Sequence, residues 1–136
     1  MIHTERKVTV KTENCTVDIP IILYRGDGGI EINFEILDNR FKFTSTMNYI
    51  QNSQASYGQL VIKNPNGTST FSEVNRCKSG KVILTITKSM IDEIEEVGAY
   101  SFQIRLFDEE QTSRITLPPI VSGIIIKEPI ASEDNN

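Results

Sequence analysis

The sequence has no tryptophan, a single histidine and only two cysteines among its 136 residues. The histidine, His3, lies near the chain start, so the rest of the chain has no base for a nucleophilic serine or cysteine triad. The spacings HExxH, GxxxxGK(S/T) and GxGxxG and the EF-hand loop pattern are missing too. These absences exclude the familiar zinc-hydrolase, phosphate-loop, calcium-loop and triad chemistries. We therefore expect no catalytic residue, no metal or other cofactor, and no enzyme activity.

The two cysteines, Cys15 and Cys77, stand far apart and form no CxxC motif, which excludes the usual zinc-binding patterns. The chain start, MIHTERKVTVKTEN, is polar and has no apolar stretch that resembles a signal-peptide core. We therefore expect a protein made in the cytoplasm, where thiols stay reduced. Two free thiols are the favoured interpretation, and the sequence leaves open whether they pair.

Positive charge is scarce, because 14 lysines and arginines face 18 acidic residues, for a net charge of -4. No basic stripe of the kind that neutralises phosphates is visible, so we expect no nucleic-acid partner. The longest apolar clusters, 19–24 and 123–126, are far too short to cross a bilayer, so we expect no membrane partner. The length fits a single domain, placed at residues 1–130, with a flexible tail at 131–136.

Alternation of apolar and polar residues is abundant. In Ile30–Leu37, IEINFEIL, the apolar positions alternate with two acids and an asparagine, which predicts a strand with one buried face. The same period predicts strands around Val8 and Val10, at 17–23, around Phe41 and Phe43, at 60–62, 82–86 and 100–106, and a last apolar strand at 120–127. Pro20 cannot donate to a ladder, so we expect the run at 17–23 to lie at a sheet edge or to carry a bulge.

Turn and cap residues separate these runs. Asn64-Pro65-Asn66-Gly67 predicts a hairpin turn, 78–81 and 108–111 predict loops, and residues 44–56 predict a long polar loop. A helix is predicted at about 89–97, with Ser89 as N-cap, Gly98 after its end, and an apolar stripe of Met90, Ile91, Ile94 and Val97. The fold class that fits is all-β: an antiparallel two-sheet β-sandwich with this one short α-helix.

The stretch Arg25-Gly26-Asp27-Gly28-Gly29 contains the tripeptide that cell-adhesion receptors recognise. A tripeptide match carries a high false-positive risk, and adhesion requires delivery outside the cell, for which the sequence gives no signal. The segment also joins two alternating runs. We therefore interpret it as a connecting turn in which Asp27, Gly28 and Gly29 supply positive φ.

A few residue sets have chemistry that only the fold could assemble. Two pairs of neighbouring carboxylates could in principle hydrolyse glycosides: Asp27 with Glu31, and Asp108 with Glu109. Four aromatic side chains could stack on a sugar, although core or edge packing is the favoured interpretation: Tyr24, Tyr49, Tyr57 and Phe107.

The segment Gly80–Ile130 carries a more specific order of elements. It runs from a strand to a helix closed by Gly98, to a strand ending in an acidic turn, then through Ser-Arg-Ile-Thr-Leu-Pro-Pro to a closing strand. This order resembles the N-terminal domain of phage baseplate upper proteins, found in tailed phages and prophages of Gram-positive bacteria. The earlier segments 26–29, 30–37 and 64–68 are compatible with that family, so the resemblance extends over most of the chain.

The resemblance implies a non-enzymatic β-sandwich module that anchors receptor-binding proteins to the tail or baseplate core. Its implied partners are other phage tail or baseplate proteins, with a homo-oligomer in the assembled particle. Its implied location is the virion tail or baseplate, after synthesis in the bacterial cytoplasm. Family members usually continue into helical and receptor-binding regions, and the polar segment 38–56 is longer here than the corresponding connection.

The resemblance transfers no docking residue to this sequence, so the partner interface stays unknown at this point. Exposed strand positions such as Ser101, Gln103 and Arg105, or the Pro118-Pro119 corner, are the surfaces we expect to meet neighbours. The alternative function is a carbohydrate- or receptor-binding β-sandwich, which requires a concave polar and aromatic groove.

Overall fold

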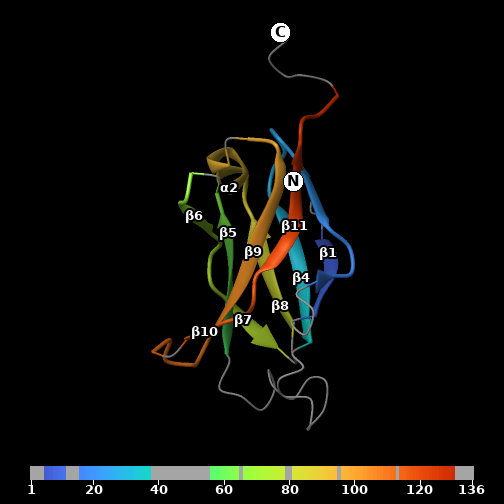
Figure 1. Cartoon of the computed structure of the whole chain (residues 1–136). Helices are drawn as coiled ribbons and strands as arrows, with labels where there is room; N and C mark the ends of the chain where they lie inside the picture. The colour runs from blue at the N-terminus through green and yellow to red at the C-terminus, as the bar shows by residue number, and fades with distance from the viewer. Residues whose placement is uncertain are drawn as a thin grey trace.

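The computed structural model describes residues 5–11, 16–37, 56–64, 66–78, 81–94, 96–112 and 114–130 (Figure 1). Within these residues the chain is mostly β-structure with one short helix. The predicted strand around Phe41 and Phe43, most of the polar loop 44–56 and the tail 131–136 lie outside the described residues.

The strands carry the alternation that the sequence predicts. In chain order the elements are β1 (Glu5–Lys11), β2 (Thr16–Val17), β3 (Ile21–Tyr24), β4 (Ile30–Leu37), β5 (Tyr57–Lys63), β6 (Ser69–Phe71), β7 (Asn75–Lys78), β8 (Lys81–Ile86), α2 (Lys88–Glu93), β9 (Gly98–Phe107), β10 (Arg114–Thr116) and β11 (Ile120–Lys127). The predictions for β4 and β11 have the observed bounds. The prediction of an all-β protein with one short helix is confirmed.

The prediction of two antiparallel sheets is wrong. Backbone pairing runs through one curled sheet in the order β2-β1-β4-β8-β7-β5-β9-β11-β3, with β6 beside β5 and β10 beside β9. The sheet is also mixed, because β1 pairs with β4 and β3 pairs with β11 in parallel. Alternation reports which face of a strand is buried but neither its neighbour nor its direction, and so it could not reveal this order.

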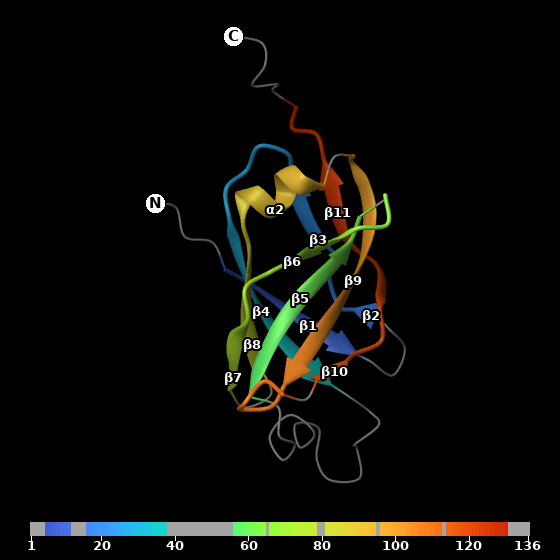
Figure 2. The same cartoon turned by 90° about the vertical axis from the view of Figure 1, so that its left-hand side faces the viewer.

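The two ends of the sheet are consecutive in the chain. β2 ends one side and β3 ends the other, and only Asp18–Pro20 separates them. The curl brings the ends of the sheet together (Figure 2). β2 contacts β11, and Arg6 Nη1 donates to Ile22 O at 3.1 Å. Pro20 therefore lies between β2 and β3, where the predicted run at 17–23 passes from one end of the sheet to the other. Its position next to an edge strand confirms the prediction that this run lies at a sheet edge.

Asp18 makes this first corner. Its N–H donates to Thr9 O at 3.2 Å, which extends the ladder between β1 and β2 by one residue. Its Oδ1 accepts from Thr9 N at 2.9 Å and from Ile19 N at 2.9 Å. A side-chain oxygen thus takes the place of a backbone carbonyl, and the chain can turn away toward β3 while Thr9 keeps its acceptor.

Ser72 makes a second corner, between β6 and β7. Its N–H donates to Leu60 O at 3.0 Å, and its Oγ accepts from Leu60 N at 2.9 Å. Its own carbonyl is turned aside and accepts from Gln59 Nε2 at 3.0 Å. After this kink the chain enters β7, which pairs with both β5 and β8. It thereby connects the two halves of the sheet, β2-β1-β4-β8 on one side and β5-β9-β11-β3 on the other. Strands that bend in this way are how sheets form corners.

The inward side chains of both halves form one continuous hydrophobic core. Phe34 of β4 and Phe102 of β9 meet across it, with ring centroids 5.8 Å apart in a tilted arrangement. Such aromatic pairs are favourable beyond the area that they bury. Two buried polar side chains, Asn64 and Thr70, satisfy each other through a bond from Asn64 Nδ2 to Thr70 Oγ1 at 2.9 Å.

Helix α2 begins earlier and ends sooner than predicted. Its N-cap is Thr87, not Ser89: Thr87 Oγ1 accepts from Met90 N at 3.2 Å, and the backbone at Thr87 is extended. Met90, Ile91 and Ile94 are buried as predicted, but Val97 is 47% exposed because the helix stops at Glu93. Threonine is also a favoured N-cap, and Thr87 has the extended backbone that an N-cap requires, so the helix begins two residues before the predicted serine cap.

The predicted turns at 64–67 and 108–111 are confirmed. Gly67 has φ +88°, and its N–H donates to Asn64 O at 3.1 Å in the β5–β6 hairpin. Asp108 holds the second turn by accepting from Thr112 N at 2.7 Å and from Thr112 Oγ1 at 2.9 Å.

Strand β11 carries an irregularity that depends on a glycine. Its register with β9 shifts between Ile120 and Ile124, and Ser122 there has φ +57°. A Cβ on Gly123 would lie 2.4 Å from Phe102 Cε2 and 2.9 Å from Ile120 Cγ2. The backbone therefore approaches the Phe102 ring more closely than any side chain would allow.

We predict that Gly123→Ala destabilises the domain by about 1–3 kcal/mol, because the Phe102 ring must shift in a packed core. The matched control is Gly28→Ala, where an added Cβ meets nothing within 4 Å. Urea denaturation followed by far-UV circular dichroism gives both values. Equal stability of the two variants would contradict the packing argument.

We predict that Ser72→Ala costs about 1–3 kcal/mol, because it leaves the buried Leu60 N–H without its acceptor. Ser69→Ala is the control, since Ser69 is exposed in the adjacent strand β6. Hydrogen exchange at the Leu60 amide should accelerate in Ser72→Ala and stay unchanged in Ser69→Ala. An unchanged Leu60 amide in both variants would show that the hydroxyl does not hold this corner.

Candidate functional site

Strands β5 and β9 are paired side by side (Figure 2), and their outward side carries arginine and aromatic side chains. Because inward positions such as Leu60 and Ile104 are buried, the alternate positions face outward. We call this surface the β5–β9 outer face. Cross-strand pairing and alternation place the following residues on it: Tyr57, Gln59, Val61 and Lys63 of β5, Phe71 of β6, Arg76 of β7, Ser101, Gln103, Arg105 and Phe107 of β9, and Arg114 and Thr116 of β10.

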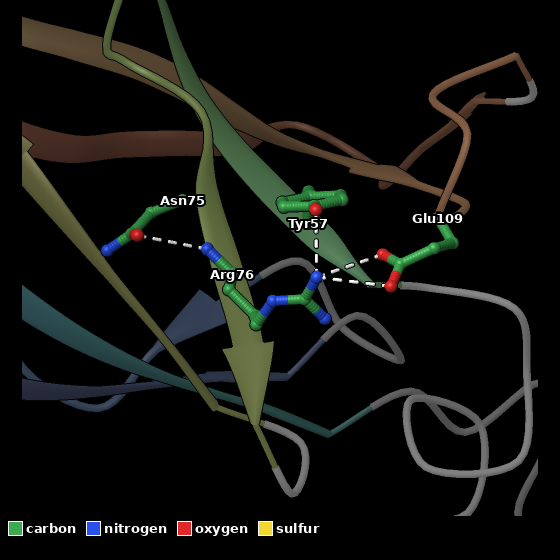
Figure 3. Close-up of polar contacts among 4 residues, drawn as sticks. All are labelled: Tyr57, Asn75, Arg76 and Glu109. Carbon is green, nitrogen blue, oxygen red and sulfur yellow. Dashed lines mark hydrogen bonds and ion pairs between the residues drawn. The ribbon is translucent and has the colours of Figure 1, made fainter.

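One end of this face is held by Arg76. Its Nη2 donates to Tyr57 OH at 2.8 Å and to the two carboxylate oxygens of Glu109 at 3.1 and 3.0 Å (Figure 3). Its Cζ lies 4.7 Å from the centre of the Tyr57 ring. Asn75 anchors the backbone beside it, because Oδ1 accepts from Arg76 N at 3.0 Å and Nδ2 donates to Ile83 O at 2.7 Å.

The electrostatics of this cluster are those of an exposed ion pair. The side chains of Arg76 and Glu109 are 56% and 57% exposed. Hydrogen bonding to Glu109 and its negative charge raise the pKa of the Arg76 guanidinium above its ordinary value. Exposed pairs of this kind add little to stability, but this one fixes the orientation of the arginine over the tyrosine ring.

The centre of the face repeats the pairing of an arginine with a ring. Arg105 Cζ lies 5.0 Å from the centre of the Phe71 ring, although 45% of Phe71 remains exposed. The glutamines beside them are tied to the backbone, since Gln59 Nε2 donates to Ser72 O and Gln103 Nε2 donates to Leu117 O at 3.0 and 3.1 Å. The face is therefore an ordered surface of arginines, rings and tethered amides.

An arrangement of arginines and rings is suited to binding another molecule. Arginine and aromatic side chains dominate the energetic centres of protein interfaces, because each buries a large area and offers directional contacts. Within the described part of the chain, no group of three or more His, Cys, Asp and Glu side chains is placed to hold a metal ion. A search of those same residues finds no helix that is long and apolar enough to span a membrane.

The Arg25-Gly26-Asp27 tripeptide is a turn, as predicted, but Gly26 and not Asp27–Gly29 carries the positive φ, at +88°. Arg25 is committed to the fold: its Nη1 donates to Ile94 O at 3.0 Å and its Nε lies 3.3 Å from Glu128 Oε1. Arg25 N also donates to Lys127 O at 3.0 Å. The arginine that adhesion would require thus holds β3, β11 and the end of α2 together.

The carboxylate pairs serve local structure. Asp108 holds its own turn through Thr112, and Glu109 binds Arg76. Asp27 is exposed in the turn before β4, whereas Glu31 is half-buried on that strand.

The structure brings together two of the four candidate aromatic residues. Tyr57 and Phe107 are directly opposite each other in the β5–β9 register. Tyr24 lies at the end of β3 beside Arg25, and Tyr49 is outside the described residues. Ser101, Gln103 and Arg105 are outward on β9 and half-buried, whereas the Pro118-Pro119 corner joins β10 to β11.

Sequence reasoning missed Phe71, Arg76 and Arg114. They lie in β6, β7 and β10, which are strands of three or four residues without visible alternation. Cross-strand pairing alone brings them onto one face: Phe71 lies opposite Val61, Arg76 opposite Tyr57, and Arg114 opposite Phe107. No local signal could have revealed that pairing, because it depends on the order of strands in the sheet.

Cys77 lies next to Arg76 and is a free, half-buried thiol, as predicted for it. Burial raises the pKa of the Cys77 thiol from 9.0 to about 11, and the positive charge of Arg76 only partly opposes this shift. The thiol therefore stays protonated at neutral pH and behaves as a small apolar side chain. Cys15 lies outside the described residues.

The comparisons with known proteins concern the fold. No family model matches the sequence, and no curated protein matches it. One of the solved structures that resemble the chain is described as the N-terminal domain of phage TP901-1 ORF48. The likeness has a TM-score of 0.61 at 14% sequence identity, and it covers 91% of this chain and 98% of that one. At this identity it shows that the two chains share a fold.

We predict that Cys77 of a Cys15→Ser variant reacts about 100-fold more slowly with iodoacetamide at pH 8 in the native protein than in urea. A pKa of about 11 in place of 9.0 lowers the reactive thiolate fraction by that factor. Mass spectrometry of timed samples gives both rates. Similar rates in the two states would contradict the burial of this thiol.

Proposed function

We propose that this chain is a structural module of a phage tail or baseplate, which links the tail or baseplate core to receptor-binding proteins. The observation that carries the proposal is the shared fold with the N-terminal domain of a phage protein over nearly the whole of both chains. The order of elements in Gly80–Ile130, which resembles baseplate upper proteins, supports it independently.

The shape of the domain suits a connecting role. One curled sheet with a continuous core supports the outer face, whose arginines and glutamines are held by contacts within the domain. We propose that other tail or baseplate proteins are its partners and that it is present in several copies in the assembled particle, on the virion tail or baseplate. Repetition around a symmetric tail makes weak single contacts effective through avidity. Such a role requires no catalytic residue.

A carbohydrate-binding function is the less favoured alternative. A sugar would have to stack on an exposed ring, and Tyr57 and Phe107 are adjacent on the β5–β9 outer face. The guanidinium of Arg76 lies 4.7 Å from the centre of the Tyr57 ring, where a sugar ring would stack. The arrangement therefore favours a protein contact over a sugar contact.

The proposal predicts that the chain is built into phage particles at one place. Particles purified from the source strain that expresses the chain with a C-terminal epitope tag should carry antibody-gold label at the distal end of the tail. A tagged cytoplasmic protein of the same strain is the control and should give no label. Label on capsids, or particles free of the tagged chain, would contradict a tail role, and a glycan array would then test the alternative.

A further inference from the structure

The β5–β9 outer face concentrates positive charge on a chain that is negative as a whole. Lys63, Arg76, Arg105 and Arg114 all project from it, whereas the chain has a net charge of -4. Glu109 pairs with Arg76 at the edge of the face. A surface with cations gathered against the overall charge attracts a partner of opposite sign and disfavours a second copy by the same face.

The arginines are presented in a way that suits carboxylates. The Arg105 guanidinium lies over Phe71, with Cζ 5.0 Å from the ring centre, and a guanidinium has five N–H donors that can bind a carboxylate. Arg76 already binds a carboxylate on this face, since its Nη2 donates to both oxygens of Glu109 while the guanidinium lies over Tyr57. A guanidinium held by a ring can bind a carboxylate through two parallel bonds, which a lysine cannot do.

The face is also ordered before any partner arrives. Gln59 and Gln103 are fixed to backbone carbonyls, and Arg76 and Arg105 are fixed on rings. The loss of side-chain freedom on binding is therefore smaller than for free surface residues. Binding to a face that is already ordered does not require a helix or loop to close over it.

We propose that the β5–β9 outer face is the docking surface for a carboxylate-rich protein surface of a neighbouring assembly protein; this inference rests on the proposed function. Nucleic acid is the competing polyanion. Single strands bind by stacking bases on exposed rings, and here guanidinium groups already lie over Tyr57 and Phe71. The observations therefore favour carboxylates over phosphates.

The test is an NMR titration of the whole chain with a short poly-L-glutamate peptide. Amide shifts should move in β5, β9 and β10 and stay still in β1 and β4. The variant Arg105→Gln/Arg114→Gln should bind about tenfold more weakly or worse, because two charge-assisted contacts are lost. The matched control Lys7→Gln/Lys11→Gln removes the same charge from the exposed side of β1 and should bind as the wild type does.

Several outcomes would overturn the inference. The first two are an equal loss of peptide affinity in both double variants and amide shifts that map to strands other than β5, β9 and β10. The other two are no peptide binding at low salt and tighter binding to an oligothymidylate of the same charge. If the double variant loses its fold because Phe71 is uncovered, the single variant Arg114→Gln decides, since Arg114 is exposed on β10. Its normal affinity for the peptide would then count against the inference.

Particles distinguish failure of this inference from failure of the proposed function. If the tagged Arg105→Gln/Arg114→Gln chain still labels the tail as the wild type does, the face is not the docking surface, although the tail role stands. If the wild-type chain never enters particles, the tail role fails whatever the peptide titration shows. If the Arg105→Gln/Arg114→Gln chain folds but no longer labels the tail, while the wild-type chain does, both the docking surface and the tail role are supported.

Discussion

Two side-chain oxygens hold the sheet in its curled form, because each replaces a backbone carbonyl where the chain turns from one half of the sheet to the other. Asp18 Oδ1 accepts from Thr9 N, and Ser72 Oγ accepts from Leu60 N, both at 2.9 Å. In both cases the N–H of the same residue donates back to the carbonyl of its partner. The Leu60 N–H is buried, and buried backbone groups are rarely left unpaired, so the second corner would be costly without this substitute. The continuous core and the position of every outer strand depend on these two turns.

The outer face is a consequence of the second corner. The kink at Ser72 sends β6 along one part of β5 and β7 along another, so that Phe71 and Arg76 reach the same face from one short segment. The carbonyl that Ser72 turns aside is taken by Gln59, a residue of that face. The arginines and rings are thus positioned by the same backbone geometry that closes the sheet. A domain with such a face is suited to holding other proteins in place, as the proposed tail role requires.

The sequence predicts the long half-buried strands well, because Ile30–Leu37 and residues 120–127 show their burial directly as alternation or β-branched runs. It fails for Asn75–Lys78 and Arg114–Thr116, whose side chains mostly point to solvent and leave no apolar period. The sequence also does not predict which strands are neighbours or in which direction they run. The parallel pairs of β1 with β4 and of β3 with β11 join residues that share no local sequence pattern. The candidate surface could therefore be predicted at Ser101, Gln103 and Arg105 of β9, and its rings Tyr57 and Phe107 are candidates in the sequence, but Phe71, Arg76 and Arg114 could not be predicted.

A cryo-electron microscopy reconstruction of the tail tip that contains this chain tests the account most directly. The account predicts the curled domain at the tail tip with Arg105 and Arg114 covered by carboxylates of a neighbouring protein. A tail-tip map in which the β5–β9 outer face is open to solvent, while another side of the domain makes the contacts, would contradict it.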